Sequence, residues 1–166
     1  MVTQTVVTNL KLKGREILSS YAAFTLEGEI TARVKRGKDS FIITERNGIA
    51  KGTSDGEAEA IYIPNAKAIR SMDKNIAPLL PKRVVIKKPQ DIFDAVYKFD
   101  LELVKRAGPN KKRWGGNACL AASTALFQTL LKASGYEPWQ LLAPTKGPKN
   151  FFFPNIAFNM VCGGEH

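Results

Sequence analysis

Two short stretches carry residue types that could do chemistry. Near the C-terminus the chain reads "FNMVCGGEH", in which an apolar run leads through Gly163 and Gly164 to Glu165 and His166. This pattern is typical of a strand that leads into a ligand-binding loop. The second stretch is "KGTSDGEAEA", which contains Ser54 between glycines. As residue types alone, Ser54 is predicted to be a turn residue or a helix N-cap, and His166 a group of a flexible tail.

The cysteines do not form a recognisable site. Cys119 and Cys162 lie inside apolar segments, and neither shares a metal-ligand spacing with the other or with His166, the only histidine. We therefore expect reduced packing residues, and the sequence predicts no metal site and no cofactor. Trp114 and Trp139 are expected to anchor the core or an interface rather than to stack on a cofactor.

The strongest compositional signal is a net charge of +10, with an excess of lysine and arginine between residues 82 and 113. The electric field of such a charge excess favours docking on RNA, a phosphate-rich ligand or an acidic protein surface. The alternative is that these residues form a solvated face that keeps the protein soluble. No aromatic residues interleave with the lysines and no nucleic-acid module signature appears, so specific base recognition is not expected. The predicted basic patch consists of Lys82, Arg83, Lys87, Lys88, Lys111, Lys112 and Arg113.

The sequence also bears on the compartment. No stretch is apolar over the roughly 18 residues that a membrane helix needs, and the N-terminus lacks the layout of a secretory signal. Residues 1–15 are basic and free of acids, as in a transit peptide, but contain little arginine. We expect an intracellular protein with no membrane partner, and mitochondrial import stays open.

The elements that must position these residues begin with β-structure. In "FTLEGEITARVKRG" apolar and polar residues alternate, which predicts a strand with one buried face. A turn at residues 36–39 leads to the return strand "SFIITE", which is bounded by Asn47 and Gly48. An earlier strand over residues 5–12 completes a three-stranded antiparallel meander. The residues predicted on the buried face are Leu26, Ile30, Ala32 and Val34.

Helical spacing follows the strands. A first helix is predicted to end at Pro78 and a second to run from Pro89 to Gly108. The third, "GGNACLAASTALFQTLLKASGYEP", is alanine-rich and apolar on most sides, so it is predicted to lie inside the domain, with Asn117 as its N-cap and Gly135 beyond its end. The apolar positions are Ala66, Ile69, Met72 and Ile76 in the first helix, and Ile92, Val96, Phe99 and either Leu103 or Val104 in the second.

The predicted fold class is therefore α+β, a three-stranded antiparallel meander followed by a bundle of about three helices. After a short helical turn in "PWQLL", the chain continues as a proline and glycine loop and ends in the extended apolar run "FFFPNIAFNMVC". We expect residues 1–142 to form the domain. Residues 143–166 are expected to form a loop, a C-terminal apolar strand and a Gly-Gly-Glu-His tail.

The order of several local strings resembles the N-terminal region of enolases. "GREILSS" is similar to that family's Arg-Glu-Ile-Leu-Asp-Ser run, "KGTSDGEAEA" to its Ser-Gly-Ala-Ser-Thr-Gly loop, and "NIAPLL" to its Ile-Ala-Pro helix end. The alanine-rich helix and "PNIAFNMVCGGEH" resemble its Gly-Ala-Asn-Ala-Ile-Leu helix and its Asn-Gly-Gly-Ser-His loop. The strings keep their order across nearly the whole chain, which implies an enolase N-terminal fold.

The resemblance assigns ancestry to two residues. Ser54 falls on the mobile-loop serine that binds the second magnesium ion in enolases, and His166 on the histidine of the loop that closes over the substrate. In enolases the metal carboxylates and the catalytic lysine and glutamate come from a following barrel, which needs at least about 200 residues that this sequence does not contain. "SSYAAFT" also replaces the family's Ser-Arg-Gly-Asn-Pro-Thr segment, and Asp55 replaces a threonine. Ser54 and His166 are therefore interpreted as vestigial.

Three functions follow as hypotheses. The first is a non-catalytic enolase-like protein, a structural or binding subunit of a larger assembly in which other protein chains cover the apolar C-terminal run. The second is the N-terminal part of a magnesium-dependent phosphopyruvate hydratase, which dehydrates 2-phosphoglycerate. The third is an RNA-associated basic subunit. Divergent enolase-like proteins also occur in flagella, so the resemblance implies a cytoplasmic or a cytoskeletal or flagellar location. The predicted interface consists of Trp139, Phe151, Phe152, Phe153 and Phe158.

Overall fold

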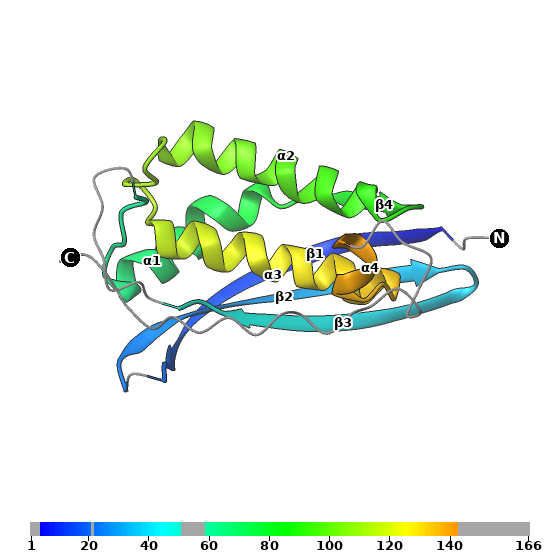
Figure 1. The fold of residues 1–166 in the computed structure, drawn as a ribbon, viewed down its shortest axis with the longest axis horizontal. Helices are drawn as coiled ribbons and strands as arrows, with labels where there is room; N and C mark the ends of the chain where they lie inside the picture. The colour runs from blue at the N-terminus through cyan, green and yellow to red at the C-terminus, as the bar shows by residue number, and fades with distance from the viewer. Residues whose placement is uncertain (1–3, 21, 51–58, 143–166) are drawn as a thin grey trace, which may run out of the picture.

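A four-stranded antiparallel sheet with helices on one face makes up the fold (Figure 1). The structure is a computed structural model that describes residues 4–20, 22–50 and 59–142. The strand order is β3-β2-β1-β4, so β3 and β4 form the two edges. The strands are β1 (Thr5–Leu18), β2 (Phe24–Arg36), β3 (Asp39–Gly48) and β4 (Arg83–Ile86).

The predicted meander is confirmed, with two corrections. The four apolar residues predicted to face inward on β2 are all buried, and the turn between β2 and β3 uses Gly37 and Lys38. However, β1 continues to Leu18 instead of ending at Leu12, because residues 13–18 pair with the start of β2. The short strand β4, which the sequence did not predict, pairs with the start of β1.

Three main helices cover the sheet. They are α1 (Asn65–Ser71), α2 (Gln90–Ala107) and α3 (Gly116–Ser134), and a short α4 (Pro138–Leu142) follows. The first predicted helix is less regular than expected, since a π-turn (Met72–Ile76) and a 3-10 turn (Ala77–Leu79) follow α1 and pass Pro78. Its buried positions are Ala68, Met72 and Ile76, whereas Ala66 is exposed. In α2 the predicted residues Ile92 and Phe99 are buried and Val96 is partly buried. Of the two alternatives at the end of that helix, Leu103 is buried and Val104 is exposed.

Helix α3 lies at the centre of the fold, as its composition predicted. It packs against β1, β2, β3, α1 and α2. Small side chains allow this, because a buried stripe of alanines brings the helix backbone close to the sheet. The tightest point is Gly28 on β2, where a Cβ atom would lie 2.5 Å from the carbonyl oxygen of Ala121. The helix ends at Gly135 in the left-handed conformation, as predicted.

Two further observations delimit the fold. The described residues reach the end of α4 at Leu142, and the predicted division between residues 142 and 143 stays a prediction. Among the described segments, no helix combines the length and the apolar character needed to cross a membrane.

Replacing Gly28 by alanine is expected to lower the free energy of unfolding by about 1–3 kcal/mol, because the added methyl group meets backbone that cannot move aside. Gly14→Ala is the matched control. Gly14 is the cross-strand partner of Gly28, and its Cβ would meet the flexible end of the Met72 side chain. Denaturant unfolding of both variants should show the larger loss for Gly28→Ala, and equal losses would contradict the close approach of α3.

Candidate functional site

The candidate site is formed by the described residues on either side of residues 51–58, the segment that contains Ser54. We call residues 49–50 the outgoing stem, residues 59–63 the returning stem, and both together the loop frame. The outgoing stem follows β3 and is fixed by three hydrogen bonds. Ile49 donates its backbone N–H to the carbonyl of Leu26 at 2.9 Å. The buried hydroxyl of Thr25 donates to the carbonyl of Ile49 at 2.8 Å, and the hydroxyl of Tyr62 donates to that of Ala50 at 3.3 Å.

The returning stem, residues 59–63, is held by the loop between α2 and α3 and by the start of α3. The N–H of Ile61 donates to the carbonyl of Asn110 at 2.8 Å, and the N–H of Gly116 donates to the carbonyl of Ile61 at 2.7 Å. One more residue, at the start of α3, binds the returning stem. The buried side chain of Asn117 donates to the carbonyl of Ile63 at 2.8 Å and accepts from its N–H at 3.4 Å.

The role of Asn117 corrects the sequence prediction. Asn117 is not the N-cap of α3, because the helix begins at Gly116 and the capping residue Gly115 makes no side-chain bond. The amide of Asn117 instead pairs with both polar groups of a backbone segment that lies 54 positions away in the chain. The stem of the loop is therefore tied to the most deeply packed helix of the domain.

Gly115 and Gly116 make this contact possible. Gly115 has a φ of 91°, which other residues rarely adopt, and a Cβ atom there would lie 2.6 Å from the Ile63 side chain. A Cβ atom on Gly116 would meet the side chain of Ala60 at 2.8 Å. Both glycines leave room for the returning stem to run directly over the start of α3.

An exposed apolar pair lies at the tip of the β1–β2 hairpin. Leu18 and Phe24 are cross-strand partners, and they are 64% and 67% exposed. The tip is joined to the start of α1, which follows the returning stem, because the side chain of Asn65 donates to the carbonyl of Phe24 at 3.3 Å. In Figure 1 this hairpin end projects beyond the helices on the side opposite to β4. Two further apolar residues of the frame, Ile61 and Tyr62, are 38% and 40% exposed.

A pocket of about 330 Å³ opens beside the returning stem, between α2 and α3. Its polar groups are Asp100, Lys111, Cys119 and Ser123, and its walls are mainly apolar. Burial raises the pKa of Asp100, while a hydrogen bond from Ser123 and the charge of Lys111 oppose that rise. Burial also raises the pKa of Cys119 to about 11, so its thiol is protonated and a poor nucleophile at neutral pH. The sequence prediction missed this pocket, because its members come from three segments.

The predicted ligand and interface residues are only partly within the structure. Ser54 lies outside the described residues, as do His166 and the four phenylalanines Phe151, Phe152, Phe153 and Phe158. The backbone of Trp139 lies in α4. Within residues 4–20, 22–50 and 59–142, no three His, Cys, Asp or Glu side chains are grouped so as to hold a metal ion.

The predicted basic patch separates into two groups. Arg83 begins β4 and Lys82, Lys87 and Lys88 flank that strand, whereas Lys111, Lys112 and Arg113 lie in the turn that follows α2. Helix α2 has 18 residues and is therefore about 27 Å long, and the two groups lie at its opposite ends. The second group borders the loop frame, since Asn110 bonds the returning stem. The fold thus brings together residues 111–113 and the stems of the loop, but not the whole patch.

Comparison with known proteins gives a consistent result. No family model matches the sequence. The chain is 28% identical over 168 residues to enolase 1 of Entamoeba histolytica, and 32% identical over 165 residues to the enolase of Sulfurisphaera tokodaii. Each match covers 94% of this chain and 35% of the relative. The chain therefore spans about a third of the length of these curated relatives. The match, together with the α+β fold, is consistent with their N-terminal domain region and confirms the resemblance.

Asn117→Ala is expected to destabilise the domain by about 1–3 kcal/mol, because two backbone groups of Ile63 lose their partner. The loss should be local, so amide hydrogen exchange of Ile61 and Ile63 should accelerate more than that of the β2 core. Asn65→Ala removes an exposed amide with one 3.3 Å bond and serves as the control. If exchange at Ile61 and Ile63 stayed slow in Asn117→Ala, Asn117 would not hold the stem.

Asp100→Asn is expected to raise the melting temperature at neutral pH, because it removes a charge whose burial is unfavourable. The folded-state pKa of Asp100 is raised above the ordinary aspartate value of about 3.9. The buried charge therefore lowers the free energy of unfolding in full above the folded-state pKa, and it has no effect on it below the ordinary value. The stability gain should therefore shrink as the pH falls through this window. Asp94→Asn, on the exposed face of the same helix, should show no comparable gain. A wild type more stable than Asp100→Asn at neutral pH would show that Ser123 and Lys111 outweigh burial.

Proposed function

Because the chain is homologous to enolases over 94% of its length, we propose that it works as a non-catalytic, enolase-like binding subunit of a larger assembly. In this role the domain presents the hairpin tip and the adjoining stem residues Ile61 and Tyr62 to another protein surface. A cytoplasmic location, or one in a cytoskeletal or flagellar structure, belongs to the same proposal.

The observation that carries the proposal is the exposed pair of Leu18 and Phe24. Two large apolar side chains, each about two-thirds exposed, lie side by side at the end of a hairpin that projects from the domain. Covering such side chains contributes about 1.5–3 kcal/mol each, which favours association. The adjoining residues Ile61 and Tyr62 enlarge the apolar area on the frame.

The residues between the two strands support a binding role over a catalytic one. The tip reads Ser19, Ser20, Tyr21, Ala22 and Ala23, where the resemblance places the family's active-site arginine. A turn without a cation cannot supply that positive charge to a phosphorylated substrate. Binding by the neighbouring apolar pair does not need it.

A second candidate is that the chain supplies the N-terminal part of a magnesium-dependent phosphopyruvate hydratase. It is favoured by the hydrogen bonds that hold both stems, because these stems flank the segment that contains Ser54. The magnesium ion and the chemistry on 2-phosphoglycerate would then belong to the longer parent protein. The intact mass of the natural protein separates the two candidates, because a mass near 18.3 kDa leaves no room for a barrel.

The amount of protein chains that copurify with the double variant Leu18→Ser, Phe24→Ser is expected to be about tenfold lower than with wild type, because the apolar contact is removed. Tagged protein would be expressed in the cells of its source, and bound chains would be quantified by mass spectrometry. Ile42→Ser is the matched control, because Ile42 is also 67% exposed but lies on the edge strand β3. Thermal unfolding should confirm that both proteins are folded. Equal recovery of partners with both proteins would contradict the proposal.

The same preparation tests for enzymatic activity. With 2-phosphoglycerate and magnesium added, we expect no ultraviolet absorbance of the enol product from the wild-type chain. Turnover that survived Leu18→Ser, Phe24→Ser would refute the non-catalytic role and favour the second candidate.

A further inference from the structure

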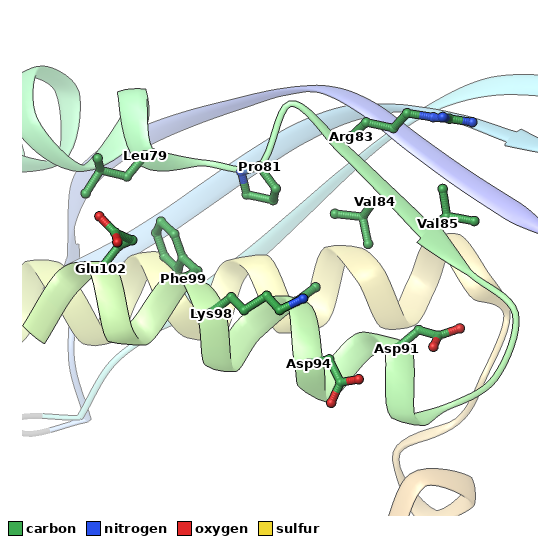
Figure 2. A pocket seen from close by; sticks show the side chains of 11 residues that line it. Leu79, Pro81, Arg83, Val84, Val85, Asp91, Asp94, Lys98, Phe99 and Glu102 are labelled. Atoms are coloured by element: carbon green, nitrogen blue, oxygen red, sulfur yellow. The ribbon is translucent and has the colours of Figure 1, made fainter.

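A groove of about 410 Å³ lies between β4 and α2 (Figure 2). Its floor is apolar, with Val84 and Phe99 only 6% and 3% exposed. Leu79 and Pro81 close one end. In Figure 2 the side chain of Val84 points toward α2, and Lys98 extends from α2 along the groove.

One wall of the groove is an open sheet edge. Strand β4 pairs only with β1, through the register from Thr5–Ile86 to Thr8–Arg83. Within the part of the chain that the structure describes, no backbone group on the other side of β4 has a partner. Such an edge presents N–H and C=O groups that can pair with an added strand.

The acidic side chains of the groove already have partners inside the domain. Asp91 accepts the N–H groups of Lys87 and Lys88 at 2.7 and 3.0 Å, which also hold its pKa below the usual range. The other two acids are bonded along α2. Asp94 accepts from Gln90 at 2.9 Å, and Glu102 accepts from Arg106 at 3.1 Å.

The cationic side chains of the groove do not have such partners. Arg83 and Lys98 are exposed, and within the described residues neither makes a hydrogen bond or an ion pair. Lys82, Lys87 and Lys88 add exposed cations at both ends of β4. These five cations outnumber the three carboxylates Asp91, Asp94 and Glu102, so the net charge around the open edge is positive.

From this combination we propose that an extended acidic segment of a partner protein adds as a strand to the open edge of β4. The side chains of an added strand alternate between the two faces of the sheet. On the face of Val84, apolar side chains enter the groove against Phe99, and an acid there reaches Lys98. On the opposite face acids meet Arg83, whose side chain points away from α2 (Figure 2).

The lysines also decide which strands are excluded. A second copy of this chain carries the same cations around its own β4, so pairing of two copies at this edge would bring like charges together. An acidic segment is instead attracted by the net positive charge around the same edge. The site lies at the opposite end of α2 from the hairpin tip, so it is independent of the proposed function.

The test measures binding of a short fluorescent peptide in which glutamate and valine alternate. We expect the affinity for this peptide to fall as the salt concentration rises. The double variant Arg83→Gln, Lys98→Gln should bind the peptide about tenfold more weakly, because it removes two exposed charge pairs between the protein and the peptide's glutamates. Lys67→Gln, Lys132→Gln is the matched control, because it removes the same net charge from exposed positions on α1 and α3. This control should bind like wild type.

Three comparison ligands complete the test. The same peptide with an N-methyl group on every residue has no backbone N–H to donate to the sheet edge and should lose binding, and a lysine–valine peptide should not bind. A single-stranded RNA oligonucleotide is the third. The proposal is overturned if N-methylation has no effect, if both double variants weaken binding equally, or if a single-stranded RNA oligonucleotide binds more tightly than the glutamate peptide. Loss of the hairpin pair Leu18 and Phe24 should leave peptide binding unchanged, which separates this test from that of the proposed function.

Discussion

The close approach of α3 to the sheet is the constraint on which the rest of the structure depends. At Gly28 the backbone of β2 lies against the backbone of α3 at Ala121, with no side chain between them. Alanines along the helix keep this distance over several turns. Because α3 also packs against α1 and α2, its depth fixes the positions of all three helices over the sheet. The start of α3 is thereby fixed as well, and with it the frame that holds the stems of residues 51–58.

This arrangement places the two proposed binding surfaces at opposite ends of the domain. At one end, the hairpin tip and the stem residues depend on the N-terminus of α3, through Gly116 and Asn117. At the other end, β4 and the N-terminus of α2 enclose the groove, and Asp91 joins them by bonding the backbone between strand and helix. The two ends share α2 and α3 as spacers but use different chemistry. Apolar contact dominates at the tip, whereas charge and free backbone groups dominate at the groove.

The sequence predicted those features that depend on local periodicity. The alternation in β2 and the spacing in α2 and α3 predicted which face of each element is buried, and those faces are buried in the structure. Strand β4 escaped prediction because four residues between lysines and prolines are too few to show a period. The continuation of β1 to Leu18 escaped because residues 13–16 are mostly polar, and only their pairing with β2 makes them a strand. Asn117 carries the local signature of an N-cap, but its partner Ile63 lies far away in the chain, so a local rule could not identify its role.

The basic residues show the same limit for the candidate sites. A count along the chain joins residues 82–113 into one patch, yet a helix of about 27 Å divides that patch in space. What matters for binding is the net charge around each site once the chain has folded. Around the groove three carboxylates accept hydrogen bonds from neighbours and keep their charge, but five cations surround the same edge, so its net charge is positive. A cation beside an open strand edge then has two effects at once. In the proposed binding it keeps identical copies apart and favours an acidic strand, so the same cations would both oppose self-association and select the proposed partner.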